Sequence, residues 1–202
     1  MKTVFLNGRF VPETEATVSV FDRGFLYGDG IFETLLICRG KPFLWKQHWE
    51  RLEQGAAFLR LQLPMNSTGA YSAIEELLRR NSMSEGVLRL TVSRGTGTRG
   101  YSIRNATSPL VVMTLHDAPE TGDSPVRWRL RTASFRVLKN DPLARIKSAN
   151  KLLHVLAKTE AEQGGYDEAL LLNSDGEIAE ATSGNIFWVE GNQVFTPPLD
   201  AG

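Results

Sequence analysis

Hydrophobic and polar residues follow two short-range patterns along this chain. Period-two alternation, which is typical of a strand with one buried face, is clear in the run at residues 126–135. The runs at residues 86–94 and 109–117 are also rich in β-forming residues. Apolar residues recur at helical spacing in three other stretches, which predicts helices over residues 46–60, 68–82 and 149–163.

Turn residues divide these segments. Asn7-Gly8 predicts a hairpin within residues 3–11, because both residues tolerate positive φ. Residues 30–45 read as a strand, a turn at Arg39-Gly40-Lys41 and a second strand, and Gly164-Gly165 is suited to end the third helix. From residue 168 onward, a β meander is expected. The polar stretch at 118–123 predicts a boundary between an α/β domain, 1–118, and a β-rich domain, 119–202.

Composition and charge narrow the class of protein. The 202 residues are 42% hydrophobic and 23% charged, and 23 basic side chains balance 23 acidic ones. This balance gives no support for binding to nucleic acid or to a membrane surface. The single cysteine, Cys38, excludes an internal disulfide framework, and no signal peptide or membrane-spanning run is present. A soluble, cytoplasmic protein is expected.

Several motifs with chemical meaning can be rejected. Residues 95–100, GTGTRG, match a dinucleotide-binding pattern, but no helical pattern follows to bind a pyrophosphate. His48, His116 and His154 are scattered, and one cysteine cannot form a thiolate metal cluster. No metal site is predicted.

Lys147 is the candidate for chemistry. It lies in "RIKSANKL", where the chain enters an apolar-striped helix, and such an amine can act as a Schiff-base nucleophile. Pyridoxal phosphate uses such a lysine, with an acid for its ring nitrogen and donors for its phosphate. A lysine beside a helix is more often a solvated charge, and spacing alone leaves both interpretations open.

Five ordered blocks resolve this choice by resemblance. They are "YGDGIFETL", "HWERL", "SRGTGTRGY", "RIKSANKL" and "DEALLLNSDGEIAEATSGNIF". Together they resemble the class IV aminotransferases, the fold-type IV enzymes that use pyridoxal 5'-phosphate, over essentially the whole chain. The resemblance implies an α+β, two-domain fold, with a small N-terminal α/β domain and a β-rich C-terminal domain. It also implies a homodimer that acts on a small amino substrate.

The resemblance also implies roles for individual residues. Lys147 matches the lysine that forms the Schiff base and later moves protons. Glu180 matches the acid that pairs with the pyridine nitrogen, and Arg51 in "HWERL" matches the phosphate-binding arginine. Three further residues match the loop that borders the cofactor: Thr182, Ser183 and Asn185.

The reaction within this family depends on finer matches. The block ending in Arg99-Gly100-Tyr101 is most similar to that of 4-amino-4-deoxychorismate lyase, so a lyase is preferred. Arg99, Tyr101 and Phe32 are then the substrate-binding candidates, with Arg99 binding a carboxylate. Branched-chain or D-amino-acid aminotransferase activity remains the alternative, because the lyase often has histidine after the catalytic lysine, where this chain has Ser148.

The end of the sequence departs from the family pattern. Family members continue beyond the equivalent of "TPPLDAG" into a segment that grips the cofactor phosphate, and this sequence ends at Gly202. The C-terminal domain is therefore expected to be incomplete. A truncated, non-catalytic relative is the remaining alternative.

Overall fold

The computed structural model describes residues 2–118 and 125–202, and the chain divides into two compact units. Unit 1 comprises Met1–Glu120 and Ile146–Asn150, and unit 2 comprises Thr121–Arg145 and Lys151–Gly202. The predicted boundary at 118–123 lies outside the described residues apart from its first residue, so the division into 1–118 and 119–202 stays a prediction. The segment that carries Lys147 belongs to unit 1.

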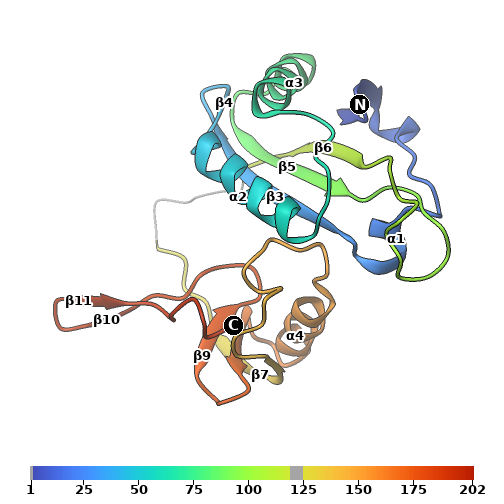
Figure 1. Ribbon diagram of the computed structural model, residues 1–202. Helices are drawn as coiled ribbons and strands as arrows, with labels where there is room; N and C mark the ends of the chain where they lie inside the picture. The colour runs from blue at the N-terminus through green and yellow to red at the C-terminus, as the bar shows by residue number, and fades with distance from the viewer. Residues whose placement is uncertain (1, 119–124) are drawn as a thin grey trace. The chain divides into compact units, whose positions relative to one another are not determined.

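Unit 1 is built on a six-stranded antiparallel sheet with the order β2-β1-β6-β5-β3-β4 (Figure 1). Its strands are β1 (Thr3–Leu6), β2 (Arg9–Pro12), β3 (Gly30–Cys38), β4 (Lys41–Pro42), β5 (Gly86–Ser93) and β6 (Leu110–His116). Asn7 and Gly8 join β1 to β2 with φ values of 49° and 84°, which confirms the predicted hairpin.

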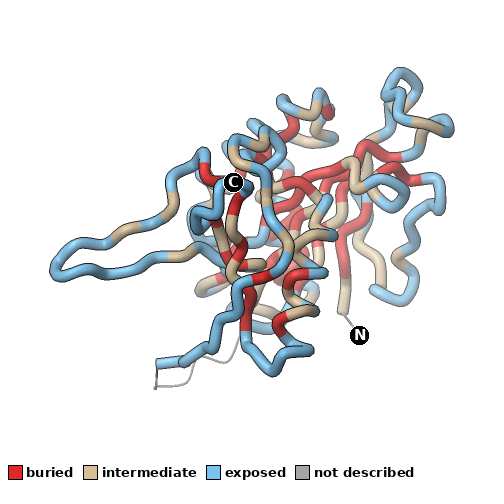
Figure 2. The backbone as a smooth tube through the Cα atoms, turned by 90° about the horizontal axis from the view of Figure 1, so that it is seen from below, coloured by how far each residue is buried: buried red, intermediate tan, exposed pale blue. Residues whose placement is uncertain are grey.

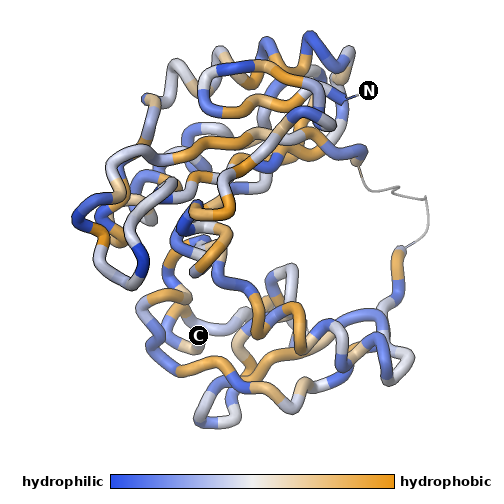
Figure 3. The backbone as a smooth tube through the Cα atoms, turned by 90° about the vertical axis from the view of Figure 1, so that its right-hand side faces the viewer, coloured by the Kyte–Doolittle hydropathy of each residue, from blue (hydrophilic) through white to orange (hydrophobic). Residues whose placement is uncertain are grey.

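Two helices, α2 (Trp45–Phe58) and α3 (Ser67–Arg80), pack on this sheet and confirm the first two predicted helices. Alternate residues of β5, namely Leu88, Leu90 and Val92, are buried in a core shared with both helices. Figure 2 shows that buried positions follow the strands, and Figure 3 shows that hydrophobic residues do the same. The odd-numbered residues of β3 from Ile31 to Ile37 are buried on the same side.

A short helix, α1 (Arg23–Tyr27), is not among the predicted elements. It is set by capping rather than by an apolar stripe. Asp22 Oδ1 accepts hydrogen bonds from the amides of Gly24 and Phe25 at 2.8 and 3.3 Å. Gly28 ends the helix with a φ of 66°, a left-handed conformation that glycine adopts without steric cost. A five-residue helix is too short to leave a periodic signal in the sequence.

Unit 2 contains a three-stranded sheet, in the order β7-β8-β9, and a single long helix. β7 (Leu130–Val137) runs parallel to β8 (Glu168–Asn173), which is antiparallel to β9 (Ile178–Ala181). α4 (Leu152–Gln163) packs on the sheet through Ala157 and Ala161. A separate hairpin is formed by β10 (Trp188–Glu190) and β11 (Gln193–Phe195).

Some predicted boundaries were wrong. β7 begins at Leu130 rather than at residue 126, and β4 is limited to two residues because Leu44 has a left-handed φ of 52°. α4 begins at Leu152 rather than at 149, because Ser148 forms a bridge with Ile31 and the Ala149 amide donates to the Gly30 carbonyl of β3. In the parts of the chain that are described, no helix is long and apolar enough to cross a membrane.

Candidate active site

Lys147 lies in a short segment, residues 146–150, that is held against β3, where Ser148 forms an isolated β-bridge with Ile31. The amide of Phe32 donates to the Lys147 carbonyl, and the amide of Ala149 donates to the Gly30 carbonyl, both at 2.9 Å. The lysine is therefore positioned by a hydrogen bond to its own carbonyl and by a second one at Ala149, two residues later. Its side chain is half-buried, which differs from the solvated charge that a lysine beside a helix usually is.

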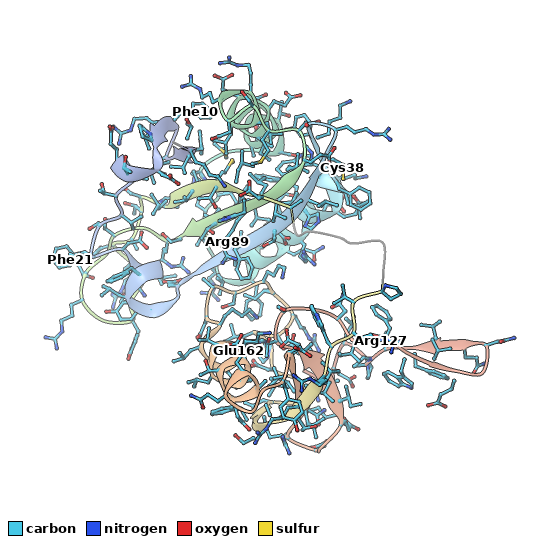
Figure 4. All side chains as sticks on the ribbon, turned by 180° about the vertical axis from the view of Figure 1, so that it is seen from behind. Phe10, Phe21, Cys38, Arg89, Arg127 and Glu162 are labelled. Carbon is cyan, nitrogen blue, oxygen red and sulfur yellow. The ribbon has the colours of Figure 1, made fainter. Side chains whose placement is uncertain are left out.

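Two cations contact the ring of Phe32. Lys147 Nζ lies 4.9 Å from the ring centroid, and the guanidinium carbon of Arg89 lies 3.9 Å from it. Arg89 is on β5, where it pairs with Thr34 across the strands, and Figure 4 labels it on the sheet of unit 1. Burial lowers the pKa of the Arg89 guanidinium.

Arg89 was not among the predicted site residues. It stands in the middle of a β-rich run, between Leu88 and Leu90, and both of these leucines are buried. An arginine inside such a strand was the available signal, because a charged residue rarely occupies a half-buried position without a function or a partner.

Arg51 is held by a buried carboxylate on β3. Its Nε and Nη2 atoms donate to the two oxygens of Glu33 at 2.7 and 2.6 Å, and His48 Nδ1 lies 2.7 Å from Glu33 Oε2. Glu33 is 2% exposed, whereas Arg51 is 46% exposed. The hydrogen bonds that Arg51 donates to Glu33 raise the pKa of Arg51 despite its partial burial. Arg51 can therefore present its outer N–H groups to a phosphate while its inner edge stays fixed.

Glu33 and His48 were also missed as members of this cluster. Glu33 and Phe32 are adjacent in β3, so their side chains point to opposite faces of the strand. An acid that falls on the buried face of an apolar strand requires a cationic partner, and this requirement was the signal.

The loop that carries Arg99 and Tyr101 is organised by Arg23 of α1. The Arg23 guanidinium donates to the carbonyls of Gly100, Ser102 and Tyr101 at 2.8, 3.3 and 3.4 Å. Arg99 is exposed, and the Tyr101 side chain is also exposed. These hydrogen bonds fix the backbone of the loop, and the substrate roles of the two side chains stay predictions.

Arg23 is in turn fixed by Asp29, which lies between two buried arginines. Asp29 Oδ2 accepts from Arg23 Nε and from Arg94 Nε, each at 2.8 Å, and Oδ1 accepts from Arg94 Nη2 at 3.0 Å. Burial alone would raise the pKa of Asp29, but the hydrogen bonds and charges of the two guanidinium groups outweigh it and lower that pKa.

In unit 2, Glu180 is paired with a histidine of α4. His154 Nε2 lies 2.9 Å from Glu180 Oε1, and their side chains are 15% and 36% exposed. Glu180 lies on β9 opposite Leu171 of β8. The carboxylate is accessible enough to meet a ligand and is oriented by a neighbour, which suits the predicted role of pairing with a ring nitrogen. His154 was dismissed as a scattered histidine in the sequence.

Thr182 and Ser183 share a buried acid, Glu168. The Thr182 hydroxyl donates to Glu168 Oε1, and the Ser183 hydroxyl donates to Oε2 at 3.0 Å. Lys158 Nζ lies 3.6 Å from the same carboxylate. Burial opposes ionisation of Glu168, but these donors together lower its pKa. Each hydroxyl has one hydrogen to donate, so in this arrangement Thr182 and Ser183 offer a ligand only acceptor oxygens. Asn185 is exposed.

The residue types fit pyridoxal phosphate. In unit 1, Lys147 supplies a half-buried primary amine and Arg51 a guanidinium suited to a phosphate. In unit 2, taken by itself, Glu180 supplies a carboxylate suited to a ring nitrogen. Among the described residues, no cluster of histidine, cysteine and acidic side chains could hold a metal ion.

Comparison with known proteins identifies the family. The profile described as "Amino-transferase class IV" matches residues 30–202. A "Putative branched-chain-amino-acid aminotransferase" of Methanocaldococcus jannaschii is 38% identical over 198 residues, 97% of this chain and 68% of that protein. The aminodeoxychorismate lyase of Bacillus subtilis is 32% identical over 202 residues, 98% of this chain and 68% of that protein. The structure of a branched-chain aminotransferase from Thermoproteus uzoniensis, solved with norvaline, has a TM-score of 0.90 at 28% identity, covering 100% of this chain and 69% of that one.

The chain belongs to the class IV aminotransferase family. The predicted family, α+β fold class, enzyme class and cofactor, pyridoxal phosphate, are thereby confirmed. Another branched-chain amino acid aminotransferase, with a TM-score of 0.91 at 29% identity, was solved with pyridoxamine 5'-phosphate. Family members act on small amino or keto acids. Both aminotransferases and a lyase occur among the relatives. The comparisons therefore establish the family, but they do not distinguish between these two reactions.

Proposed function

We propose that the protein is a 4-amino-4-deoxychorismate lyase, which forms 4-aminobenzoate and pyruvate with Lys147 as its catalytic residue. The observation that carries the catalytic assignment is the position of the Lys147 amine, held by backbone bonds at β3 and against Phe32 beside Arg89. Bound pyridoxal phosphate supplies an electron sink for a carbanion at the carbon that bears the substrate amine.

The chain's own residues then have distinct tasks. Arg51 binds the cofactor phosphate, with Glu33 fixing its orientation, and Glu180 accepts a hydrogen bond from the ring nitrogen. Lys147 removes the proton from the substrate carbon that bears nitrogen. The enolpyruvyl group leaves and takes up a proton to become pyruvate, and the remaining ring becomes aromatic.

The choice of a lyase is supported by the block at residues 93–101, SRGTGTRGY, whose glycine-rich pattern is lyase-like. Arg23 holds the backbone of this loop, so Arg99 projects from a defined position. A substrate carboxylate is the ligand that its planar guanidinium suits. An aminotransferase is the second candidate, because a relative with 38% identity carries that name.

The products distinguish these two reactions. We expect purified protein supplied with aminodeoxychorismate to release 4-aminobenzoate and pyruvate without any added keto acid. Rapid amino transfer from a branched-chain or D-amino acid to 2-oxoglutarate, without lyase activity, would instead establish the aminotransferase.

The catalytic residue can be identified directly. Borohydride reduction of the cofactor-loaded protein, followed by peptide mapping, should place the pyridoxyl group on Lys147. A label on Lys139, Lys151 or Lys158 would refute this role. Lys147→Ala should lose far more activity than Arg99→Lys. Protein that shows no cofactor absorbance when supplied with pyridoxal phosphate would support a non-catalytic relative.

We also propose that the protein forms a homodimer through exposed apolar residues around α1. Phe21, Phe25 and Tyr101 are 67%, 72% and 87% exposed, and Tyr101 packs edge-on against Tyr27. Figure 4 shows Phe21 at the outer edge of unit 1. Exposed apolar side chains that gather in one region mark an interaction surface. An active, cofactor-loaded monomer in sedimentation experiments would contradict this proposal.

A further inference from the structure

His154 and Glu180 form a pair within unit 2 that is more specific than a surface ion pair. His154 lies in the first turn of α4, and its Nε2 is 2.9 Å from Glu180 Oε1. The bond uses one carboxylate oxygen and leaves Oε2 outside it. Four residues further along the same helix, Lys158 reaches Glu168, which holds the hydroxyls of Thr182 and Ser183. One side of α4 therefore contacts both Glu168 of β8 and Glu180 of β9.

The surroundings of the second ring nitrogen, Nδ1, indicate which nitrogen of the His154 imidazole carries the hydrogen. His154 Nδ1 is buried, and no described residue forms a hydrogen bond with it. A hydrogen on Nδ1 would be a buried donor without an acceptor, which costs more than a buried lone pair that is left unpaired. The carboxylate oxygen in front of Nε2 requires a donor there. The hydrogen is therefore on Nε2, and His154 donates to Glu180.

We infer that His154 is a positioning residue that acts on the cofactor through Glu180, by donating its Nε2 hydrogen to Oε1 and directing Oε2 toward the pyridine nitrogen. The inference rests on the proposed function, because it needs Glu180 to be the partner of that nitrogen. This positioning role requires a hydrogen-bond donor at the position of Nε2, and it does not require an imidazole that gains and loses a proton.

Two amide substitutions separate this role from simple packing. In His154→Gln, the side-chain amide can place an N–H group where Nε2 stands. In His154→Asn, the shorter side chain places its amide near the position of Nδ1, where no acceptor is available. Both variants are polar and neither titrates. His116→Asn is the matched control, because His116 is exposed on β6 and its ring nitrogen lies beside the hydroxyl of Thr114 on the same strand.

The first measurement is the dissociation constant for pyridoxamine 5'-phosphate, which binds without a covalent bond to Lys147. We expect His154→Asn to weaken binding by about 10- to 100-fold, the range for a hydrogen bond to a charged group. His154→Gln and His116→Asn should stay within about threefold of the unmodified protein. Circular dichroism and urea unfolding would verify that each variant is folded.

The second measurement is the ring-nitrogen resonance of 15N-labelled pyridoxamine 5'-phosphate, which reports protonation of that nitrogen. The unmodified protein and His154→Gln should keep the nitrogen protonated, and His154→Asn should shift the resonance toward the neutral form. A purely structural role for His154 would leave this resonance unchanged in every folded variant.

A double variant tests whether His154 acts through Glu180. The double variant His154→Asn/Glu180→Gln should bind pyridoxamine 5'-phosphate no more weakly than Glu180→Gln alone, because Glu180→Gln has already removed the carboxylate through which His154 acts. Equal binding by His154→Asn and His116→Asn, or equal weakening by the Asn and Gln variants, would overturn the inference while the proposed function stands. An unmodified protein that fails to bind the probe would overturn the proposed function and this inference with it.

Discussion

Replacing Asp29 with asparagine should destabilise unit 1 strongly, because this carboxylate is shared by two buried guanidinium groups. The side chains of Arg23 and Arg94 are 4% and 7% exposed, and Asp29 is 14% exposed. Asparagine keeps one acceptor oxygen but turns an NH2 group toward donors. Removing one partner of a buried ion pair costs about 3–5 kcal/mol, because an uncompensated charge remains.

The cost for Asp29→Asn should fall at the lower end, about 3 kcal/mol, because both arginines keep backbone acceptors. Arg94 still donates to the carbonyls of Leu59 and Arg60, at 2.8 and 3.0 Å. Urea unfolding at neutral pH measures this change as a lower midpoint with an unchanged slope. Asp117→Asn is the control, since Asp117 is 83% exposed beside Lys2 and should change stability by less than about 1 kcal/mol. Equal stability of the two variants would refute the reasoning.

Three further outcomes are expected. Glu33→Gln should lower the free energy of unfolding in urea by about 2 kcal/mol, because Glu33 is buried. Glu50→Gln, on the exposed side of α2, should lower it by less than about 0.5 kcal/mol. Equal losses for the two variants would contradict the importance of the buried cluster. The lowered pKa values of Asp29 and Glu168 stabilise the fold above the unfolded pKa of about 4, so the free energy of unfolding should decline as pH falls below that value, and less steeply for Asp29→Asn. Gly95→Ala should be far more disruptive than Gly100→Ala in thermal unfolding, because a Cβ at Gly95 would lie 1.7 Å from the Ser108 carbonyl oxygen, while nothing lies within 4 Å at Gly100.

Much of the fold could be predicted because its elements carry local signals. The Asn7-Gly8 turn, the alternating residues of β5 and the stripe of α2 are each determined by neighbours in the sequence. The start of α4 could not be predicted in this way. Ala149 and Asn150 belong to the predicted helix, but the Ala149 amide is hydrogen-bonded to the Gly30 carbonyl of β3, more than 100 residues earlier. A tertiary contact overrides local preference there.

In the candidate site, some residues are indicated by their neighbours in the sequence, and others only by contacts between distant parts of the chain. Lys147, Arg51 and Glu180 are predicted site residues because they stand in recognisable blocks, whereas the sequence gives no such indication for Glu33 and His154. Both contact a more exposed residue for which a ligand-binding role is proposed: Glu33 is 2% exposed beside Arg51 at 46%, and His154 is 15% exposed beside Glu180 at 36%. Chemistry that depends on placing charges accurately needs such fixed supports, because mobile side chains would lose binding energy on being ordered.

This arrangement gives a physical criterion for finding supporting residues in a sequence. An acid that falls on the core face of an apolar strand, as Glu33 does in GIFETLL, is too costly to bury alone. Its presence therefore predicts a cationic or donor partner from another element, even when that element cannot be named. Glu168, at the start of β8, is also buried, although it alternates with the core residues Ala169 and Leu171 instead of sharing their face. It too is found with partners, namely Lys158, Thr182 and Ser183. His154 does not meet it, because a histidine can be buried as a neutral group. Its contact with Glu180 gives the orientation of the ring, and its Nδ1, to which no described residue forms a hydrogen bond, indicates which ring nitrogen carries the hydrogen.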